Sequence, residues 1–307
     1  MKKSPFVYGV TVSDDAFTNR EKEIKRLKSN MLNNINTMII SPRRWGKTSL
    51  VEKVSKQISA RHAKVKVVNL DLFATSSKEE FLEQFASEVI KASSTKLDDW
   101  VNSAKSILKS ITPSISLGVE PMTDFNLKFN WDNSSKNINQ ILNLPEALAK
   151  EKGIEFVICI DEFQNLATFD DYESFEKKMR SLWQRQIHVT YCLYGSMRHM
   201  MLDIFDNSSR PFYRFGDIIL LPKISTKKWV KFITQGFAST KKVISDELAE
   251  EIAEAMGNHD GAGLIRNGCF EIDWIDVAIR QGDIAKNRHA VVLDNGRDSR
   301  RKAGRHG

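Results

Sequence analysis

The amino-acid sequence predicts an α/β fold of three layers, in which helices cover both faces of a parallel β-sheet. Short apolar runs alternate along the chain with segments of helical periodicity. The runs Thr37–Ile40, Ile154–Ile160 and Val189–Tyr194 are largely apolar, as expected for strands that are buried on both faces. The length of 307 residues is sufficient for a full hydrophobic core.

The order of the expected elements supports this fold. The expected strands are Thr37–Ile40, Lys64–Leu72, Ile154–Ile160, Val189–Tyr194 and Asp217–Leu221. The expected helices are Arg20–Asn30, a segment with Leu50, Val51, Val54 and Ile58 on one face, Lys78–Ala92, Phe175–Gln186 and Arg198–Asp206.

Two segments depart from the alternating pattern. Residues 93–139 contain the alternating runs Ile115–Val119 and Phe125–Trp131, which predict a β-hairpin inserted on the main sheet. After the last strand, Lys227–Ala238 and Asp246–Met256 predict two helices with no strand between them. We therefore expect an α/β domain over 1–222, a partial helical lid over 223–259 and a separate tail over 260–307.

Composition and charge exclude several classes of protein. A net charge of +7 is mild for this length and permits contact with nucleic acid without arguing for it. No run approaches the roughly 18 to 20 apolar residues that span a bilayer, so we expect no membrane partner. The three cysteines lack the spacing of metal ligands. These features predict a cytoplasmic protein.

The segment from Ser41 to Thr48 matches the phosphate-binding pattern G-x-x-x-x-G-K-[ST], called Walker A, except that Ser41 replaces the first Gly. Such a loop wraps backbone N–H groups around an anion and passes into a helix N-terminus, where the dipole favours phosphate. We expect Lys47 to neutralise the β- and γ-phosphates and to be exposed without nucleotide, and Thr48 to coordinate Mg²⁺. The expected nucleotide-binding residues here are Ser41, Pro42, Arg43, Arg44, Trp45, Gly46, Lys47, Thr48 and Ser49.

A second acidic motif, of the Walker B type, stands at the end of the most apolar strand. Asp161 and Glu162 follow the run Phe156–Ile160 directly. Asp161 at a strand end can hold magnesium, and Glu162 can accept a proton from an attacking water. Ligands bind at the carboxyl ends of parallel strands, so the two motifs predict one site for ATP and Mg²⁺.

Together these motifs resemble the prokaryotic P-loop ATPases of the AAA+/STAND group, in particular the archaeal-type predicted ATPase family. The resemblance covers about residues 5–259. Its matching stretches are Phe17–Ile24, Ser41–Leu50, Asp161–Gln164, Tyr194–Ser196 and Arg210–Phe215.

The resemblance implies further roles. Arg20 and Glu21 would lie beside the adenine, Ser196 would sense the γ-phosphate, and Arg210 would act on a nucleotide in cis or across a subunit interface. The residues themselves leave simpler alternatives open. Ser196 can cap the following helix, Arg210 can pair with a nearby acid, and Arg43 can belong to a mobile basic rim.

These observations predict a Mg²⁺-dependent ATPase, a hydrolase that couples nucleotide state to movement of a protein partner. ATP binding is better supported than turnover. One alternative is an ATP-dependent switch with little hydrolysis, and another is a DNA-associated ATPase that resembles origin-recognition initiators. A homo-oligomer is compatible with either.

The last 48 residues differ in composition from the rest. Residues 260–307 hold 2 Lys and 7 Arg, whereas residues 1–259 hold 27 Lys and 10 Arg, which together make the 46 basic residues. Seven of the 15 glycines also fall there. We interpret this segment as an out-of-frame or disordered tail, with a genuine basic tail as the alternative.

Overall fold

The computed structural model describes residues 20–43, 45–108, 114–116, 125–129, 131, 134–239 and 242–258. Arg44, the Phe17–Asn19 part of the first family stretch, and the interpreted tail at 260–307 lie outside these residues. The chain divides into two compact units, and the boundary that follows the main sheet falls between Lys223 and Ile224.

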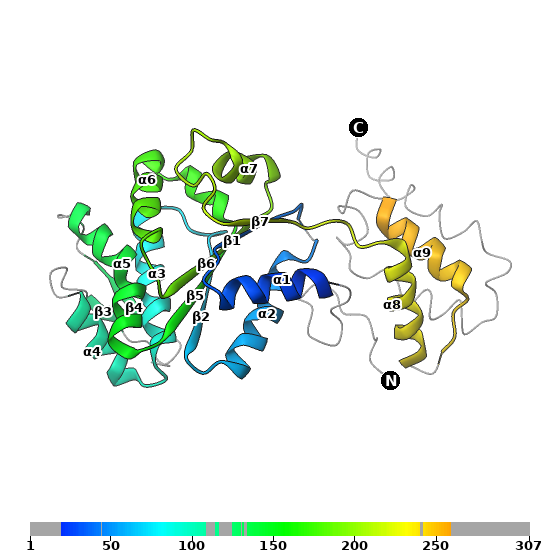
Figure 1. Cartoon of the computed structure of the whole chain (residues 1–307), viewed down its shortest axis with the longest axis horizontal. Helices are drawn as coiled ribbons and strands as arrows, with labels where there is room; N and C mark the ends of the chain where they lie inside the picture. The colour runs from blue at the N-terminus through cyan, green and yellow to red at the C-terminus, as the bar shows by residue number, and fades with distance from the viewer. Residues whose placement is uncertain are drawn as a thin grey trace, which may run out of the picture. The chain divides into compact units, whose positions relative to one another are not determined.

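A sheet of five parallel strands forms the larger unit (Figure 1). Its order is β2-β5-β6-β1-β7, and every pairing is parallel, as the sequence predicted. All carboxyl ends of the strands therefore meet at one edge of the sheet. The strands are β1 (Thr37–Ile40), β2 (Val65–Asp71), β5 (Glu155–Asp161), β6 (Val189–Gly195) and β7 (Asp217–Leu220).

Helices cover both faces of this sheet, which confirms the three layers (Figure 1). Successive residues of β1 point to opposite faces of the sheet. Ile39 packs in the apolar cluster on one face, and Met38 and Ile40 pack in the cluster on the other. Beside Ile39 lie α1 (Glu21–Leu32) and α2 (Lys47–Arg61). The opposite face packs against α3 (Lys78–Ser93), α4 (Leu97–Ile107), α5 (Ser134–Lys152), α6 (Tyr172–Trp183) and α7 (Arg198–Asp206).

The insertion contains the predicted hairpin in a shorter form. Strands β3 (Ser114–Ser116) and β4 (Asn126–Lys128) pair antiparallel, with Ile115 opposite Leu127. The sequence analysis did not predict α4 or α5, which flank this hairpin in the chain.

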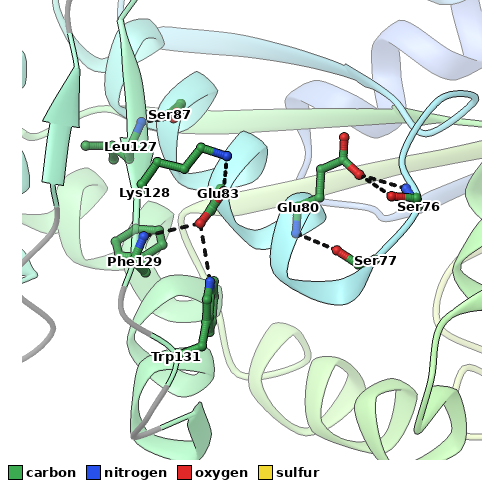
Figure 2. A network of polar contacts seen from close by, with 9 residues as sticks. All are labelled: Ser76, Ser77, Glu80, Glu83, Ser87, Leu127, Lys128, Phe129 and Trp131. Atoms are coloured by element: carbon green, nitrogen blue, oxygen red, sulfur yellow. Dashed lines mark hydrogen bonds and ion pairs between the residues drawn. The ribbon is translucent and has the colours of Figure 1, made fainter.

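One carboxylate on α3 fixes the segment that carries β4 (Figure 2). Glu83 accepts hydrogen bonds from Lys128 Nζ at 2.8 Å and from the Phe129 N–H at 3.2 Å. It also accepts one from the indole N–H of Trp131 at 3.3 Å. Ser87, one turn further along α3, accepts from the Leu127 N–H at 3.0 Å. The insertion is therefore attached to α3 through polar groups as well as through buried apolar side chains.

The two predicted helices after the sheet are present as α8 (Thr226–Ser239) and α9 (Asp246–Asn258). They pack on each other through a small apolar cluster that includes Ile233, Phe237 and Ala249. In the described part of the chain, no helix is both long and apolar enough to cross a membrane.

A buried ionic cluster joins α6 to the turn after α7. Glu176 on α6 is 1% exposed, and its Oε2 lies 3.0 Å from Arg210 Nη2. The same nitrogen donates to the Tyr172 hydroxyl at 3.0 Å, and Asp203 lies 3.5 Å from Arg210 Nε. Burial raises the pKa of Glu176 to about 7, although the charge of Arg210 opposes that shift.

We predict that Glu176 makes folding stability depend on pH. A carboxyl group whose pKa is raised in the folded state contributes to folding stability while the pH is below the pKa of the same group in the unfolded chain. This contribution is lost as the pH rises through the folded-state pKa of about 7. The melting temperature of Glu176→Gln minus that of the wild type should therefore increase between pH 5 and pH 8.5. Glu151→Gln, an exposed change on α5, controls for the loss of one negative charge. A difference that stays constant or shrinks with pH would contradict the raised pKa.

Candidate functional site

The loop between β1 and α2 has the geometry of a phosphate cradle. Gly46 directly precedes α2 and has φ +82°, a left-handed conformation that favours glycine. A Cβ at this position would meet no atom within 4 Å, so open space lies beside the loop. Ser41 is buried at the start of the loop. The N-terminus of a 15-residue helix therefore faces a space in which an anion can lie.

Lys47 is buried, not exposed as the sequence analysis expected. Its amine turns back into the loop and donates to the backbone carbonyls of Ser41 and Pro42, at 3.2 and 3.3 Å. These carbonyls replace water around the ammonium, which explains the difference. Burial lowers the pKa of Lys47, while the charges of Glu162 and Asp161 oppose the shift.

Thr48 brings the two predicted motifs together. Its hydroxyl donates to Asp161 Oδ2 at 2.6 Å, from the first turn of α2 to the end of β5. Asp161 is 8% exposed, and burial raises its pKa although the hydrogen bond from Thr48 opposes the shift. The contact joins residues 113 positions apart in the sequence.

Glu162 follows Asp161 in the left-handed backbone region, with φ +49°. This turn leads into a 3₁₀-helix, η1 (Phe163–Thr168). The carboxylate Oε2 of Glu162 accepts from the Ser196 hydroxyl at 2.8 Å and from Gln164 Nε2 at 2.5 Å. Burial tends to raise the pKa of Glu162, but these donors and the charge of Lys47 outweigh burial and lower it.

Ser196 lies at the end of β6, between Glu162 and the phosphate-binding loop. Besides donating to Glu162, its hydroxyl accepts from Arg43 Nε at 3.4 Å. The cap of α7 is Met197 and no side chain closes it, so the alternative that Ser196 caps this helix is wrong. The exposed Arg43 reaches the acidic motif through this serine.

Arg20 binds the phosphate-binding loop through a backbone carbonyl. Arg20 is 3% exposed, and its guanidinium donates to the carbonyl of Trp45 at 3.1 Å and to that of Pro222 at 2.8 Å. It also lies 3.5 Å from Glu23. Arg20 thus ties the start of α1, the phosphate-binding loop and the chain after β7 together.

Arg210 lies in the ionic cluster of Glu176, Tyr172 and Asp203 described above. Within the described residues, the polar contacts of its side chain are to that cluster and not to the phosphate-binding loop. This placement favours the alternative in which Arg210 pairs with a nearby acid. An action on the nucleotide of another subunit stays a prediction.

The residues present suit a magnesium ion that is shared with phosphate. No cluster of three or more His, Cys, Asp or Glu side chains that could hold a metal occurs in the described part of the chain. A hard cation here would have the oxygens of Thr48 and Asp161, which already lie 2.6 Å apart. Magnesium is commonly held by one or two protein oxygens together with substrate phosphates, so this donor set fits it.

Gln164 is a contact of Glu162 to which the sequence analysis gave no role. It is 1% exposed and lies two residues beyond Glu162. The sequence signal that could have indicated it is the stretch Asp161–Gln164, which ends at this residue and carries part of the family resemblance.

Comparison of the fold with solved structures finds a Walker-type ATPase and several DNA-replication proteins. It is similar to a Walker-type ATPase of Pyrococcus abyssi, at 20% identity and a TM-score of 0.57, over 93% of this chain and 80% of that protein. It is also similar to ORC1 of Aeropyrum pernix, solved in complex with DNA, at 12% identity and a TM-score of 0.51. That match covers 87% of this chain and 61% of the other.

A third similar structure is Cdc6 of Pyrobaculum aerophilum, at 13% identity and a TM-score of 0.51, over 92% of this chain and 67% of that one. At these identities the likeness shows the fold alone, which is that of P-loop ATPases. No curated protein sequence matches the chain significantly.

The sequence itself matches one protein family. The matched residues are 17–261, well over half of the chain, and the family is described as an ATPase domain predominantly from Archaea. They include the phosphate-binding loop, the acidic pair and Ser196. The chain therefore belongs to this family of ATPase domains.

Proposed function

We propose that this protein binds ATP with Mg²⁺ and hydrolyses it at the carboxyl edge of its parallel sheet. The observation that carries the proposal is the hydrogen bond from Thr48 to Asp161, which unites the phosphate-binding loop with the acidic motif. Glu162 and Lys47 complete the site. The charge of Glu162 raises the pKa of Lys47 and the charge of Lys47 lowers the pKa of Glu162, so each favours the charged form of the other.

Binding would rest on the loop and the helix that follows it. The N–H groups around Gly46 and the N-terminus of α2 favour the phosphates. Lys47 would exchange its two backbone carbonyl partners for phosphate oxygens and neutralise their charge. Thr48 and Asp161 would hold Mg²⁺, which when bound withdraws charge from the β- and γ-phosphate oxygens.

Hydrolysis would use Glu162 as the proton acceptor. The oxygen of a water forms a bond to the γ-phosphorus while the bond from that phosphorus to the β–γ bridging oxygen breaks. The water proton passes to the Glu162 carboxylate, and ADP and inorganic phosphate leave. The lowered pKa of Glu162 keeps this carboxylate ionised, which is the form that can accept a proton. Ser196 would place a hydroxyl between this carboxylate and the γ-phosphate side of the loop.

We further propose that nucleotide state is transmitted to a protein partner, with α8 and α9 as the elements that move. This part of the proposal rests on the family and on the presence of a separate helical unit after Lys223. Assembly into a homo-oligomer and a cytoplasmic location belong to the same proposal. A DNA-associated activity rests on the likeness of fold alone. ATP turnover is therefore measured with and without added DNA.

Lys47→Ala should weaken ATP binding by about 10- to 100-fold, because a charged hydrogen-bond donor to phosphate is lost. Calorimetry with a non-hydrolysable ATP analogue measures this directly. Lys56→Ala, an exposed change on the same helix, is the matched control and should bind like the wild type. A melting scan establishes that the variant folds, since Lys47 is buried. Unchanged affinity in a folded Lys47→Ala protein would overturn the site.

Glu162→Gln should lower ATP turnover by roughly 10² or more while leaving ATP affinity within about threefold, because the amide keeps the volume but cannot accept the proton. Glu155→Gln, at the exposed start of the same strand, is the control. Release of inorganic phosphate is measured for all three proteins, with and without added DNA. Hydrolysis by Glu162→Gln at the wild-type rate would show that Glu162 is not the base. Stimulation of the wild type by DNA would favour the DNA-associated alternative.

A further inference from the structure

We propose that Gln164 is a positioning residue for hydrolysis, which holds the Glu162 carboxylate so that one oxygen is anchored and the other faces the attacking water. The inference rests on the proposed function, in which Glu162 accepts the proton. It adds a residue that acts through Glu162 without touching the nucleotide.

The hydrogen bonds of the Glu162 carboxylate are unevenly divided between its two oxygens. In the described part of the chain, every hydrogen bond to this carboxylate reaches Oε2. The donors are Gln164 Nε2 at 2.5 Å, the Ser196 hydroxyl at 2.8 Å and the Ser196 N–H at 3.4 Å. Two of these donors belong to Ser196, directly after β6, and one belongs to Gln164 in η1, so they approach Oε2 from two parts of the fold. Oε1 is thereby left for a water.

The amide of Gln164 has one orientation that suits this site. A carboxylate only accepts hydrogen bonds, so the nitrogen of Gln164 must face Glu162 and its oxygen must face the other way. That oxygen, Oε1, is buried and has no hydrogen-bond partner among the described residues. An unpartnered buried carbonyl costs stability, and an apolar side chain of the same size would avoid that cost. The contact to Glu162 offers a functional reason for a glutamine here.

The glycine at position 195 leaves room for the side chain of Gln164. Gly195, the last residue of β6, lies against its side chain, and a Cβ at Gly195 would stand 2.0 Å from Gln164 Oε1. The same Cβ would stand 2.7 Å from Met201 Sδ. The absence of a side chain at Gly195 therefore makes the space into which the amide fits.

Packing of the preceding residue fixes the direction of Gln164. Phe163 is 1% exposed, and its ring centroid lies 5.6 Å from that of Phe205 and 5.7 Å from that of Phe212. The Asn165 N–H donates to the carbonyl of Glu162 at 2.9 Å and closes the turn. With the turn closed and Phe163 held in the core, the Gln164 side chain returns toward Glu162.

Removing the donor should affect the chemical step more than ATP binding. Gln164→Leu keeps the volume and frees Oε2 from one of its donors, so the carboxylate can leave its position. We expect kcat for ATP hydrolysis to fall about tenfold or more, with ATP affinity within about twofold. The melting temperature should not fall, because the unpartnered carbonyl is removed with the amide.

Two further variants separate positioning from general damage. Asn165→Leu removes a neighbouring side-chain hydrogen bond, from Nδ2 to the Leu72 carbonyl, and should leave kcat near the wild-type value. Gly195→Ala reaches the same contact from the other side and should reproduce the kcat defect, because its Cβ displaces the Gln164 amide. If Gln164→Leu does not fold, Gln164→Met takes its place.

The deciding measurement is a double-mutant cycle on kcat. Because Gln164 acts through Glu162, adding Gln164→Leu to Glu162→Gln should change kcat by less than about twofold. Additive losses, or an unchanged kcat in the folded single variant, would overturn the inference and leave the proposed function standing. Absence of turnover in the wild type, or full activity in Glu162→Gln, would contradict the proposed function and this inference with it.

Discussion

The hydrogen bond between Thr48 and Asp161 is the contact on which the site depends, since it joins two halves that fold from distant parts of the chain. It forms because β1 and β5 run parallel and end at the same edge of the sheet, with β6 between them. A change in strand order would separate the phosphate-binding loop from the acidic motif. The sheet topology is thus the first requirement of the proposed chemistry.

Two neighbouring carboxyl groups at this edge have opposite environments. Burial dominates at Asp161 and raises its pKa, whereas donated hydrogen bonds outweigh burial at Glu162 and lower its pKa. The difference follows from burial, because Asp161 is buried although it accepts from the Thr48 hydroxyl and the Glu162 N–H. Glu162 is only half-buried and accepts from Gln164 and Ser196. Environments that differ in this way allow adjacent acids to take separate roles, one toward a cation and one toward a proton.

The sequence was sufficient to predict the sheet, and it named residues that the fold brings together at the carboxyl edge, because both leave strong local signals. Continuous apolar runs marked the strands, and the Gly46–Thr48 triplet marked the start of α2. Helix α5 was missed because Pro145 lies within it, and proline normally ends a helical pattern. The burial of Lys47 and the contact of Gln164 could not be predicted, since both depend on side-chain directions that only the folded chain defines. The ion pair of Arg210 with the buried Glu176 could not be predicted either, because the two residues lie 34 positions apart in the sequence.

The central claim is that Thr48 and Asp161 hold Mg²⁺ beside bound ATP, and the most direct test is the ATP affinity measured by calorimetry with Mg²⁺ and with EDTA. The wild type should bind ATP more tightly with Mg²⁺ than without it. This difference should shrink in Asp161→Asn, which removes the negative charge and one of the two carboxylate oxygens, and in Thr48→Val, which removes the hydroxyl oxygen. Both substitutions preserve the size of the side chain. An ATP affinity of the wild type that is the same in Mg²⁺ and in EDTA would contradict the account.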